Sequence, residues 1–167
     1  DDVNCGSDAS IDDLPDADMT AEAWIKADGW GEAGAGGIIT GTIFYKLAWQ
    51  LVLIYYPDGT LQGVQAYAGY GGGAARTTTD VGEFIADDQE WHHIAAVLDN
   101  ATQTWDIAID GVWVSTTQSA GGGGAYTGDA ALDLHIGNNA ATSATFDGYI
   151  GWSRISDTIR YPVGITF

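Results

Sequence analysis

The chain has 167 residues, a length that suits one domain with a sizeable core, so we expect a single domain over residues 1–167. Its 23 acidic and five basic side chains give a formal net charge of -18, which would repel nucleic acid and anionic membranes over most of the surface. No apolar run approaches the roughly 20 residues of a membrane helix. We therefore expect neither nucleic-acid binding nor membrane insertion, whereas cations and neutral polymers are compatible partners for a chain of this charge.

Apolar runs of strand length alternate with glycine-rich loops along the chain. The first run, residues 21–27, follows an acidic loop and precedes the glycines of 29–37. Later runs occupy 43–56, 61–68, 91–99, 104–116, 132–137 and 149–155, with further glycine loops at 69–73 and 121–124. Many runs are rich in Ile, Val, Tyr and Trp, and none repeats apolar positions at helical spacing over three turns. The pattern predicts an all-β sandwich or barrel of short strands.

Two Asp-Gly pairs predict hairpins, because a type I′ turn needs positive φ at both central positions. Asp58-Gly59 would join a long strand over 43–55 to the run 61–68. Asp110-Gly111 sets the register of its hairpin, so that four apolar residues share one face, which we expect to face the core. They are Ile107, Ile109, Val112 and Val114. Trp113 then lies on the opposite face with Ala108 and Asp106. We expect a covering loop or a binding partner there.

The adjacent His92 and His93 lie in the run 91–99, and neighbours on a strand point to opposite faces. They therefore cannot bind one metal ion unless a bulge separates them, and hydrogen-bonded packing roles are expected instead. The same alternation places Trp91 on the face of His93, where we expect Trp24 and Trp91 to be buried. His135 has no acid-base partner that the sequence identifies.

Five motifs follow one another over residues 19–157. They are Glu22 to Trp24, Trp91 to Ile94, the Asp110-Gly111 turn, Leu134 to Gly137, and Phe146 to Ile150. This succession resembles the laminin G-like, concanavalin A-like jelly-roll family, which implies an antiparallel β-sandwich. Many relatives carry an acidic residue after the last motif, whereas Gly151 and Trp152 stand there in this chain. The stretch "GYIGWSRISDTIRY" is similar to modules of phage and microbial surface proteins.

The resemblance also implies a possible calcium ion, since relatives often bind one at the rim of the sandwich through Asp carboxylates and backbone carbonyls. The candidate ligands are Asp16, Asp18, Asp99 and Asp147. The acidic run 12–18 lacks the glycine-containing spacing of an EF-hand, so a solvated loop is the alternative reading of that cluster.

Enzymatic activity is not expected from the sequence. Glycoside hydrolases of this sandwich class place two carboxylates close together, commonly as Glu-x-Asp-x-x-Glu on one strand, and that pattern does not occur in the chain. A P-loop is also lacking, because the glycine stretch at 69–73 is not followed by Lys-Ser/Thr. A glycoside hydrolase is therefore the least favoured interpretation.

Two non-enzymatic interpretations remain. In the first, the protein binds carbohydrate or another host-surface polymer, because sugars stack on aromatic rings while polar groups bind their hydroxyls. The candidate residues are Trp30, Tyr70, Asp106, Trp113, Tyr126 and Trp152. In the second, it is a structural module of a virion, tail fibre or extracellular filament whose partners are neighbouring subunits. Both place it outside the cell, on a cell surface or on a virion, where an acidic coat with two lysines aids solubility.

Overall fold

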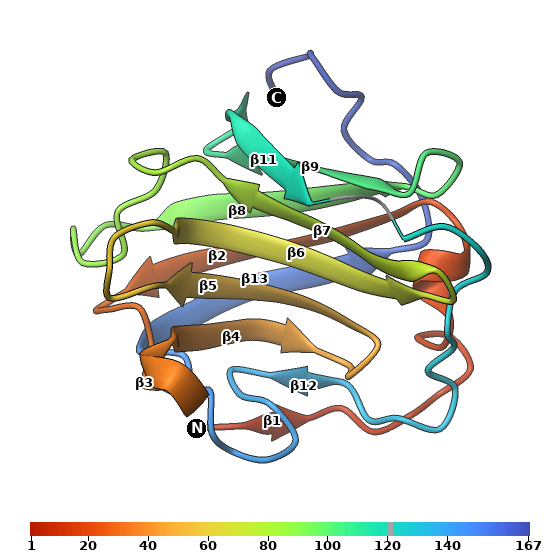
Figure 1. The fold of residues 1–167 in the computed structure, drawn as a ribbon, viewed down its shortest axis with the longest axis horizontal. Helices are drawn as coiled ribbons and strands as arrows, with labels where there is room; N and C mark the ends of the chain where they lie inside the picture. The colour runs from red at the N-terminus through yellow and green to blue at the C-terminus, as the bar shows by residue number, and fades with distance from the viewer. Residues whose placement is uncertain (120–121) are drawn as a thin grey trace.

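The structure, a computed structural model, describes residues 1–119 and 122–167 and consists mainly of strands (Figure 1). The strands are β1 (Val3–Asn4), β2 (Met19–Ala27), β3 (Glu32–Ala33), β4 (Ile39–Tyr45), β5 (Trp49–Tyr55), β6 (Gln62–Tyr70), β7 (Gly73–Thr79), β8 (His92–Asp99), β9 (Thr104–Ile109), β10 (Val112–Trp113), β11 (Thr116–Ser119), β12 (His135–Ile136) and β13 (Gly148–Ser156). Two short 3-10 helices are η1 (Leu14–Asp16) and η2 (Ala35–Gly37). The expected glycine loop at 121–124 lies partly outside the described residues.

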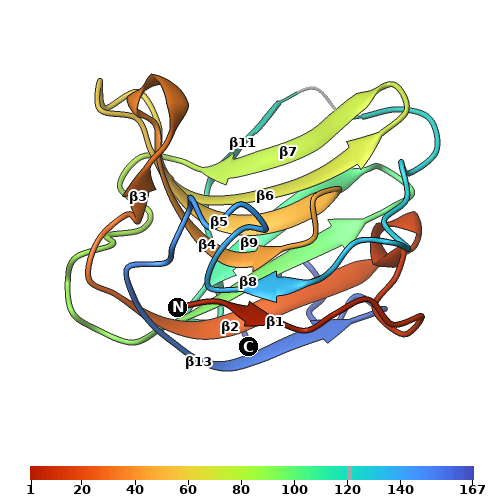
Figure 2. The same cartoon turned by 90° about the horizontal axis from the view of Figure 1, so that it is seen from below.

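The strands form two antiparallel sheets that pack face to face, and Figure 2 shows them as two layers. The larger sheet has the order β1-β12-β4-β5-β6-β7-β11, with β3 paired to β4. The smaller sheet has the order β10-β9-β8-β2-β13. The predicted all-β, jelly-roll sandwich is therefore confirmed. In the described part of the chain, no helix is long and apolar enough to cross a membrane.

The core lies between the sheets and follows strand alternation. On β2 every second residue from Met19 to Ala27 belongs to it, and on β5 Trp49, Leu51 and Leu53 face it from the larger sheet. Trp105 of β9 is also buried there. The inner faces of both sheets are thus filled by apolar side chains, so the outer faces remain for other roles.

Both predicted hairpins form, with two local differences. β10 pairs with β9 in the expected register, Val112 opposite Ile109 and Trp113 opposite Ala108, but Val112 is 52% exposed and does not join the core. The prediction of one long strand over 43–55 is wrong, because a tight turn with Leu47 at φ 48° divides this region into β4 and β5. Its apolar run is continuous in sequence, so the turn carries no Gly or Pro signal.

A C-terminal segment, residues 157–167, crosses the outer face of the smaller sheet. It begins after β13, where Thr20 Oγ1 of β2 donates to the Thr158 carbonyl at 2.8 Å. It ends beside the β9–β10 hairpin, where the Phe167 N–H donates to the Gly111 carbonyl at 3.1 Å. Figure 1 shows this path along the back of the molecule. The segment covers part of that face and leaves the rest open.

Candidate functional site

Four aromatic side chains are exposed together on the outer face of the smaller sheet. Trp24 of β2, Trp91 just before β8, and Tyr149 and Trp152 of β13 are 42%, 47%, 62% and 52% exposed, respectively. Their strands are neighbours, since β8, β2 and β13 follow one another in the sheet. We call these four residues the aromatic surface. Contiguous exposed apolar groups of this kind mark binding sites, so the aromatic surface is the candidate site.

Strand alternation and register place Trp24 and Tyr149 on this face. Ile25 faces the core and is fully buried, which turns Trp24 and Lys26 outward. Trp24 is paired with His93 of β8, and Lys26 with Tyr149 of β13. Directly paired residues lie on the same side of an antiparallel sheet, so these side chains share the outer face.

A β-bulge brings Trp152 to the same place. The register between β2 and β13 shifts between Ile150 and Ser153. Gly151 and Trp152 therefore lie together opposite Trp24. A bulge can re-aim a side chain away from simple alternation. The bulge thus adds a second indole beside Trp24.

Gly151 also makes room for Trp91. A Cβ atom built on Gly151 would lie 3.1 Å from the Trp91 ring and 3.6 Å from the Trp24 carbonyl oxygen. The Trp91 ring therefore reaches across β2 to β13 and contacts the bulge directly. The absence of a side chain at Gly151 permits this arrangement.

Arg154 supports Trp152 from one side. Its guanidinium carbon lies 4.8 Å from the Trp152 ring centroid, a cation–π contact, and its Nε donates to Glu22 Oε1 at 2.7 Å. Glu22 is fully buried on the outer side of β2. The Tyr161 hydroxyl of the C-terminal segment donates to Glu22 Oε2 at 2.6 Å, and His93 Nε2 lies 3.0 Å from the same oxygen.

These contacts keep Glu22 ionised. Burial alone would raise the pKa of its carboxyl, but the hydrogen bonds from Tyr161, Arg154 and His93 outweigh burial and hold that pKa below its ordinary value of 4.5. A buried carboxylate is stable only when it is paired in this way. Glu22 therefore anchors Arg154, and Arg154 in turn holds Trp152.

The aromatic surface offers flat rings whose edges carry indole N–H and phenol O–H groups, with the Lys26 ammonium beside them. Rings of this kind stack on apolar faces of a cyclic ligand while the donors bind its polar substituents. A cavity of about 380 Å³ adjoins the aromatic surface, because Tyr149 and Gly151 are among the residues that line it. Cavities of about 320 and 250 Å³ lie elsewhere in the described part of the chain, and none of the three is lined by Trp24, Trp91 or Trp152. The three indoles therefore form an open surface that borders this cavity at Tyr149.

Residues 3–162 match a family model described as the concanavalin A-like lectin/glucanases superfamily. The chain belongs to this superfamily. The match spans nearly all of the chain and confirms the resemblance drawn from the five motifs. The curated proteins contain no significant match to the sequence.

Solved structures with the superfamily fold include a Bacteroides ovatus protein described as a proposed carbohydrate binding protein. It is 17% identical to this chain with a TM-score of 0.64, and the match covers 96% of this chain and 42% of the Bacteroides protein. The binding domain of Paraclostridial Mosquitocidal Protein 1 has 13% identity, a TM-score of 0.61, and coverage of 94% and 38%. The LG1-3 region of the laminin alpha2 chain has 18% identity, a TM-score of 0.56, and coverage of 89% and 30%. The chain spans less than half of each of these proteins. At such identities the likeness shows the shared fold.

The expectation that Trp24 and Trp91 are buried beside His93 is wrong. Trp24 is paired with His93, with 5.5 Å between their ring centroids, and Trp91 is two residues before His93. However, Trp24 and Trp91 are 42% and 47% exposed. Alternation places the three on one face and does not say that this face is the outer one. Trp49 and Trp105 are the tryptophans that fill the core.

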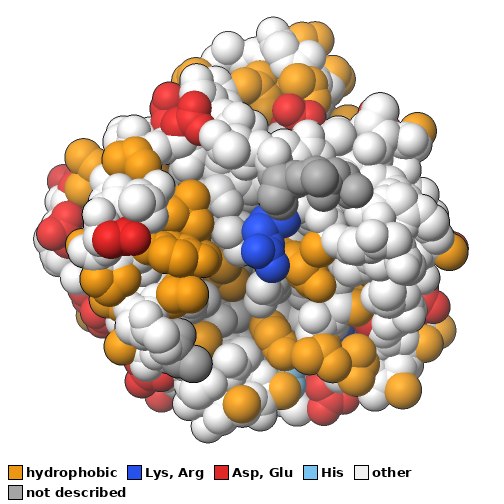
Figure 3. Space-filling model, in the orientation of Figure 1, with side chains coloured by type: hydrophobic (Ala, Val, Ile, Leu, Met, Phe, Trp, Pro, Cys, Tyr) orange, Lys and Arg blue, Asp and Glu red, His pale blue; other side chains and the backbone are white. Residues whose placement is uncertain are grey.

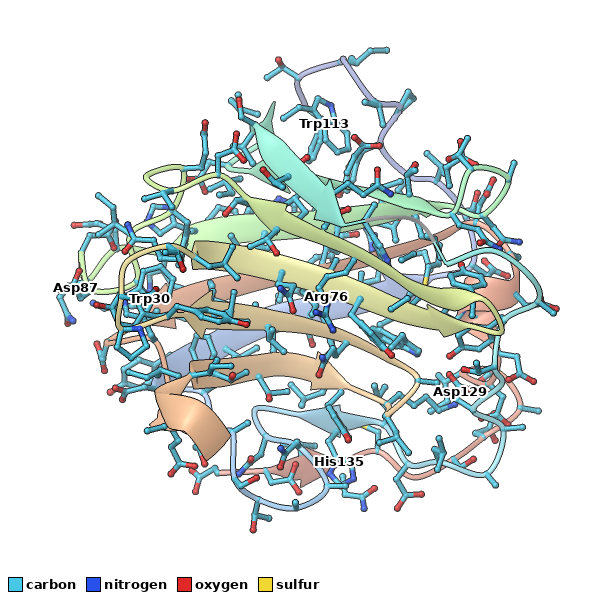
Figure 4. The ribbon with its side chains drawn as sticks, viewed as in Figure 1. Trp30, Arg76, Asp87, Trp113, Asp129 and His135 are labelled. Carbon is cyan, nitrogen blue, oxygen red and sulfur yellow. The ribbon has the colours of Figure 1, made fainter. Side chains whose placement is uncertain are left out.

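Asp106 and Trp113 lie on the same outer face, at the opposite edge of the smaller sheet. Trp113 Nε1 donates to the Ile165 carbonyl at 3.0 Å, and its ring centroid lies 5.9 Å from that of Phe167. The C-terminal segment is therefore the covering element expected over Trp113 (Figure 4). Asp106 is half-buried, and burial together with the nearby charge of Asp99 raises the pKa of its carboxyl. Neither residue adjoins the aromatic surface.

Three other candidate residues are packed elsewhere. Trp30 is half-buried and stacks on Tyr55, with 5.8 Å between ring centroids. Tyr70 is 4% exposed, and burial raises its pKa to about 12. Tyr126 donates its hydroxyl to Asp129 Oδ2 at 2.7 Å and packs edge-on against Tyr70. Of the six ligand-binding residues expected from the sequence, only Trp152 belongs to the aromatic surface.

Three of the four acids proposed for calcium lie near one another, and the fourth does not. The carbonyl of Asp16 and the carboxylate of Asp18 both accept hydrogen bonds from Asn100, next to Asp99. Asp147 lies beyond the far end of β2, a strand of nine residues that spans about 30 Å. Among the described residues, no group of three or more His, Cys, Asp or Glu side chains is arranged to hold a metal ion. The four acids therefore do not all converge on one point.

A lysine ammonium is buried among other acids at one end of the sandwich. Lys46 is fully buried, and its Nζ donates to the Ile11 carbonyl, Asp12 Oδ1 and Asp129 Oδ1 at 2.7, 2.6 and 2.9 Å. Asp13 and Asp129 also exchange hydrogen bonds, each backbone N–H donating to the other's carboxylate at 2.7 Å. Figure 4 places Asp129 at this loop end. Lys46 neutralises the carboxylates that converge there.

The histidines have hydrogen-bonded roles, as expected. His92 Nδ1 lies 2.7 Å from an Asp110 oxygen and its Nε2 lies 2.8 Å from an Asp88 oxygen. Burial alone would lower the pKa of His92, but the bonds to Asp110 and Asp88 raise it overall above 6.5. His135 Nδ1 lies 3.1 Å from a carboxylate oxygen of Asp2. That partner lies far away in sequence, which is why the sequence did not identify it.

The outer face of the larger sheet provides a contrast. Arg76 of β7 lies over the Tyr67 ring of β6, with 5.4 Å from its guanidinium carbon to the ring centroid. Figure 4 labels Arg76 near the middle of this face, and Figure 3 shows acidic side chains gathered toward its rim. Tyr67 is half-buried, unlike the exposed rings of the aromatic surface. Residues on this face therefore provide matched controls for substitutions in the aromatic surface.

Proposed function

We propose that the protein is a non-enzymatic carbohydrate-binding module that works outside the cell, on a cell surface or on a virion, and that it binds glycans through the aromatic surface. One observation carries this proposal: three indoles and one phenol from neighbouring strands are exposed on one side of a sheet. Sugars present apolar C–H faces to such rings, and their hydroxyls accept hydrogen bonds from adjacent donors. The description of the Bacteroides ovatus neighbour is compatible with this function.

The carboxylates near the aromatic surface favour binding over hydrolysis. Glycoside hydrolysis requires two carboxyl groups that flank the scissile bond. Along β2 and β13 the sequence contains one acid, Glu22, and its oxygens are engaged by Arg154, Tyr161 and His93. A second carboxylate facing it across a bound sugar is lacking on these strands.

The test is a glycan array followed by calorimetry with the glycan that binds. Trp24→Ala and Trp152→Ala should each weaken binding at least tenfold, because stacking on a single aromatic ring contributes energy of that order. Tyr67→Ala and Arg76→Gln on the larger sheet are matched controls and should leave affinity within twofold. If the control variants lose binding and the tryptophan variants retain it, the site is on the other sheet.

Calcium dependence is measured in the same assay, with added calcium and with chelator. Equal binding in both is expected, since the four candidate acids do not all converge on one point and, among the described residues, no group of three or more His, Cys, Asp or Glu side chains is arranged to hold a metal ion. Binding that disappears with chelator would show that a metal takes part.

A second candidate function is a structural role between subunits of a virion, fibre or filament. Exposed aromatic residues are also enriched at the centres of protein interfaces. Sedimentation of the wild-type protein and of Trp152→Ala separates the two candidates. Self-association that depends on Trp152, together with silence on the array, would favour the structural role.

A further inference from the structure

Most basic side chains that reach the surface lie on one face. Of the five Lys and Arg residues, Lys46 is fully buried, which leaves four. Three of these belong to the outer face of the smaller sheet or to the segment that crosses it: Lys26 of β2, Arg154 of β13 and Arg160. In a chain with a net charge of -18, this concentration distinguishes the face that carries the aromatic surface.

The acids of the chain are distributed differently. β2 and β13 together contain a single acid, Glu22, whereas most other carboxylates are in the loops between strands. Arg154 and Arg160 both approach Glu22, at 2.7 and 3.5 Å from Oε1. Lys26 takes part in none of the ion pairs found among the described residues. Lys26 is therefore the positive charge of these two strands that is not already matched by Glu22.

Lys26 also lies among the aromatic rings. It is paired with Tyr149 across β13 and is two residues from Trp24 on the same face of β2. The register between β2 and β8 ends with Ile25 opposite His92, and its continuation brings Trp91 alongside Lys26. A ring stacked on these aromatic groups would place a substituent within reach of the ammonium group.

We propose, on the basis of the carbohydrate-binding function above, that the aromatic surface selects acidic glycans and that Lys26 binds their carboxylate or sulfate group. An ammonium group forms charge-assisted hydrogen bonds with either anion. The distant acidic loops oppose this only weakly, because charges in water are screened over about 8 Å at physiological ionic strength. Three carboxylates are nearer by chain position, since Asp28 directly follows β2, Asp147 directly precedes β13 and Glu90 precedes Trp91. They lie at the strand ends, so the anionic group is expected to approach Lys26 from the Trp24 side.

The experiment compares two matched pairs of probes by calorimetry: polygalacturonate with its methyl ester, and chondroitin sulfate with its desulfated form. The first pair tests a carboxylate and the second a sulfate. The charged member of at least one pair should bind more tightly, and its affinity should fall as salt concentration rises. Lys26→Gln should lower the affinity for that probe about tenfold, the effect of one charge-assisted hydrogen bond, and leave its uncharged counterpart unchanged. Lys26→Arg should retain most of the affinity.

Arg76→Gln on the larger sheet is the charge-matched control and should have no effect. The inference is overturned if uncharged probes bind as tightly as charged ones, or if Lys26→Gln changes nothing while Trp152→Ala abolishes binding. In that second outcome the carbohydrate-binding function stands and only the ligand class is wrong. If instead neither Trp24→Ala nor Trp152→Ala weakens binding of any probe, the proposed function itself fails.

Discussion

At the scale of single residues, polar groups with several partners control how stability depends on pH. His92 is bound by two carboxylates, which favour its charged form and raise its pKa above 6.5. A group whose pKa is higher in the folded state stabilises the fold fully below its unfolded pKa. That contribution is lost as pH rises through the folded pKa.

We therefore predict that the free energy of unfolding decreases as pH is raised from 6 through neutral and mildly alkaline values. Urea denaturation at a series of pH values measures this decrease. His92→Gln should flatten the profile over that window, because its side chain does not titrate. A wild-type profile that rises over the same window contradicts the assignment.

The tryptophans give a second prediction at this scale. Trp49 is fully buried between the sheets, whereas Trp24 is 42% exposed. Trp49→Ala should lower the free energy of unfolding by about 3–5 kcal/mol, the usual result of leaving a large cavity. Trp24→Ala should lower it by less than about 1.5 kcal/mol, because solvent already reaches the ring. Thermal and urea denaturation of both variants tests the contrast, and equal losses would mean that Trp24 is a core residue after all.

At the scale of elements, the β-bulge of β13 shapes the aromatic surface. Gly151 allows the Trp91 ring to approach the strand, and Gly148 has a φ of 132° with the Lys26 carbonyl 2.2 Å from where a Cβ would lie. The two glycines therefore have different roles. Gly148 permits the strand to begin beside β2, whereas Gly151 permits the ring contact.

We predict that Gly151→Val displaces Trp91 and weakens glycan binding several-fold while it lowers stability by at most about 1.5 kcal/mol. Gly148→Val should lower stability by more, because its clash is with backbone atoms and its φ is unfavourable for residues with a Cβ. Tryptophan fluorescence, thermal denaturation and calorimetry measure the three effects. Unchanged binding by the Gly151 variant would show that Trp91 is not needed.

At the scale of the whole molecule, Lys46 joins three segments that are far apart in sequence. Its ammonium binds Ile11 and Asp12 near the N-terminus and Asp129 in the loop before β12, from the turn between β4 and β5. This is the turn that divides the long strand expected from the sequence. Removing one partner from a buried ion pair leaves an uncompensated charge.

We predict that Lys46→Met lowers the free energy of unfolding by about 3–5 kcal/mol, the range found when a buried ion pair loses one partner. Lys26→Met is the matched control on the surface and should change stability by less than about 0.5 kcal/mol. Chemical denaturation at neutral pH measures both. Similar values for the two lysines would contradict a central role for Lys46.

Local sequence determined much of the architecture. The Asp-Gly turns set two hairpins, and alternation correctly grouped His93 with Trp91 and separated it from His92. The expected fold class follows from these features because strand propensity, turn chemistry and side-chain period are local properties. The same alternation also grouped Ile107 with Ile109 on the core side of the β9–β10 hairpin.

The tertiary structure decided which of the two faces of each strand meets solvent. Alternation gives the relative sides of Trp24 and Ile25, but only the packing of the second sheet makes the Ile25 side the interior. The bulge at Gly151 and the ion pairs of Lys46 likewise depend on strands and loops brought together by folding. For this reason the sequence by itself determined the β-sandwich and its hairpins, whereas the position of the aromatic surface was decided by long-range packing.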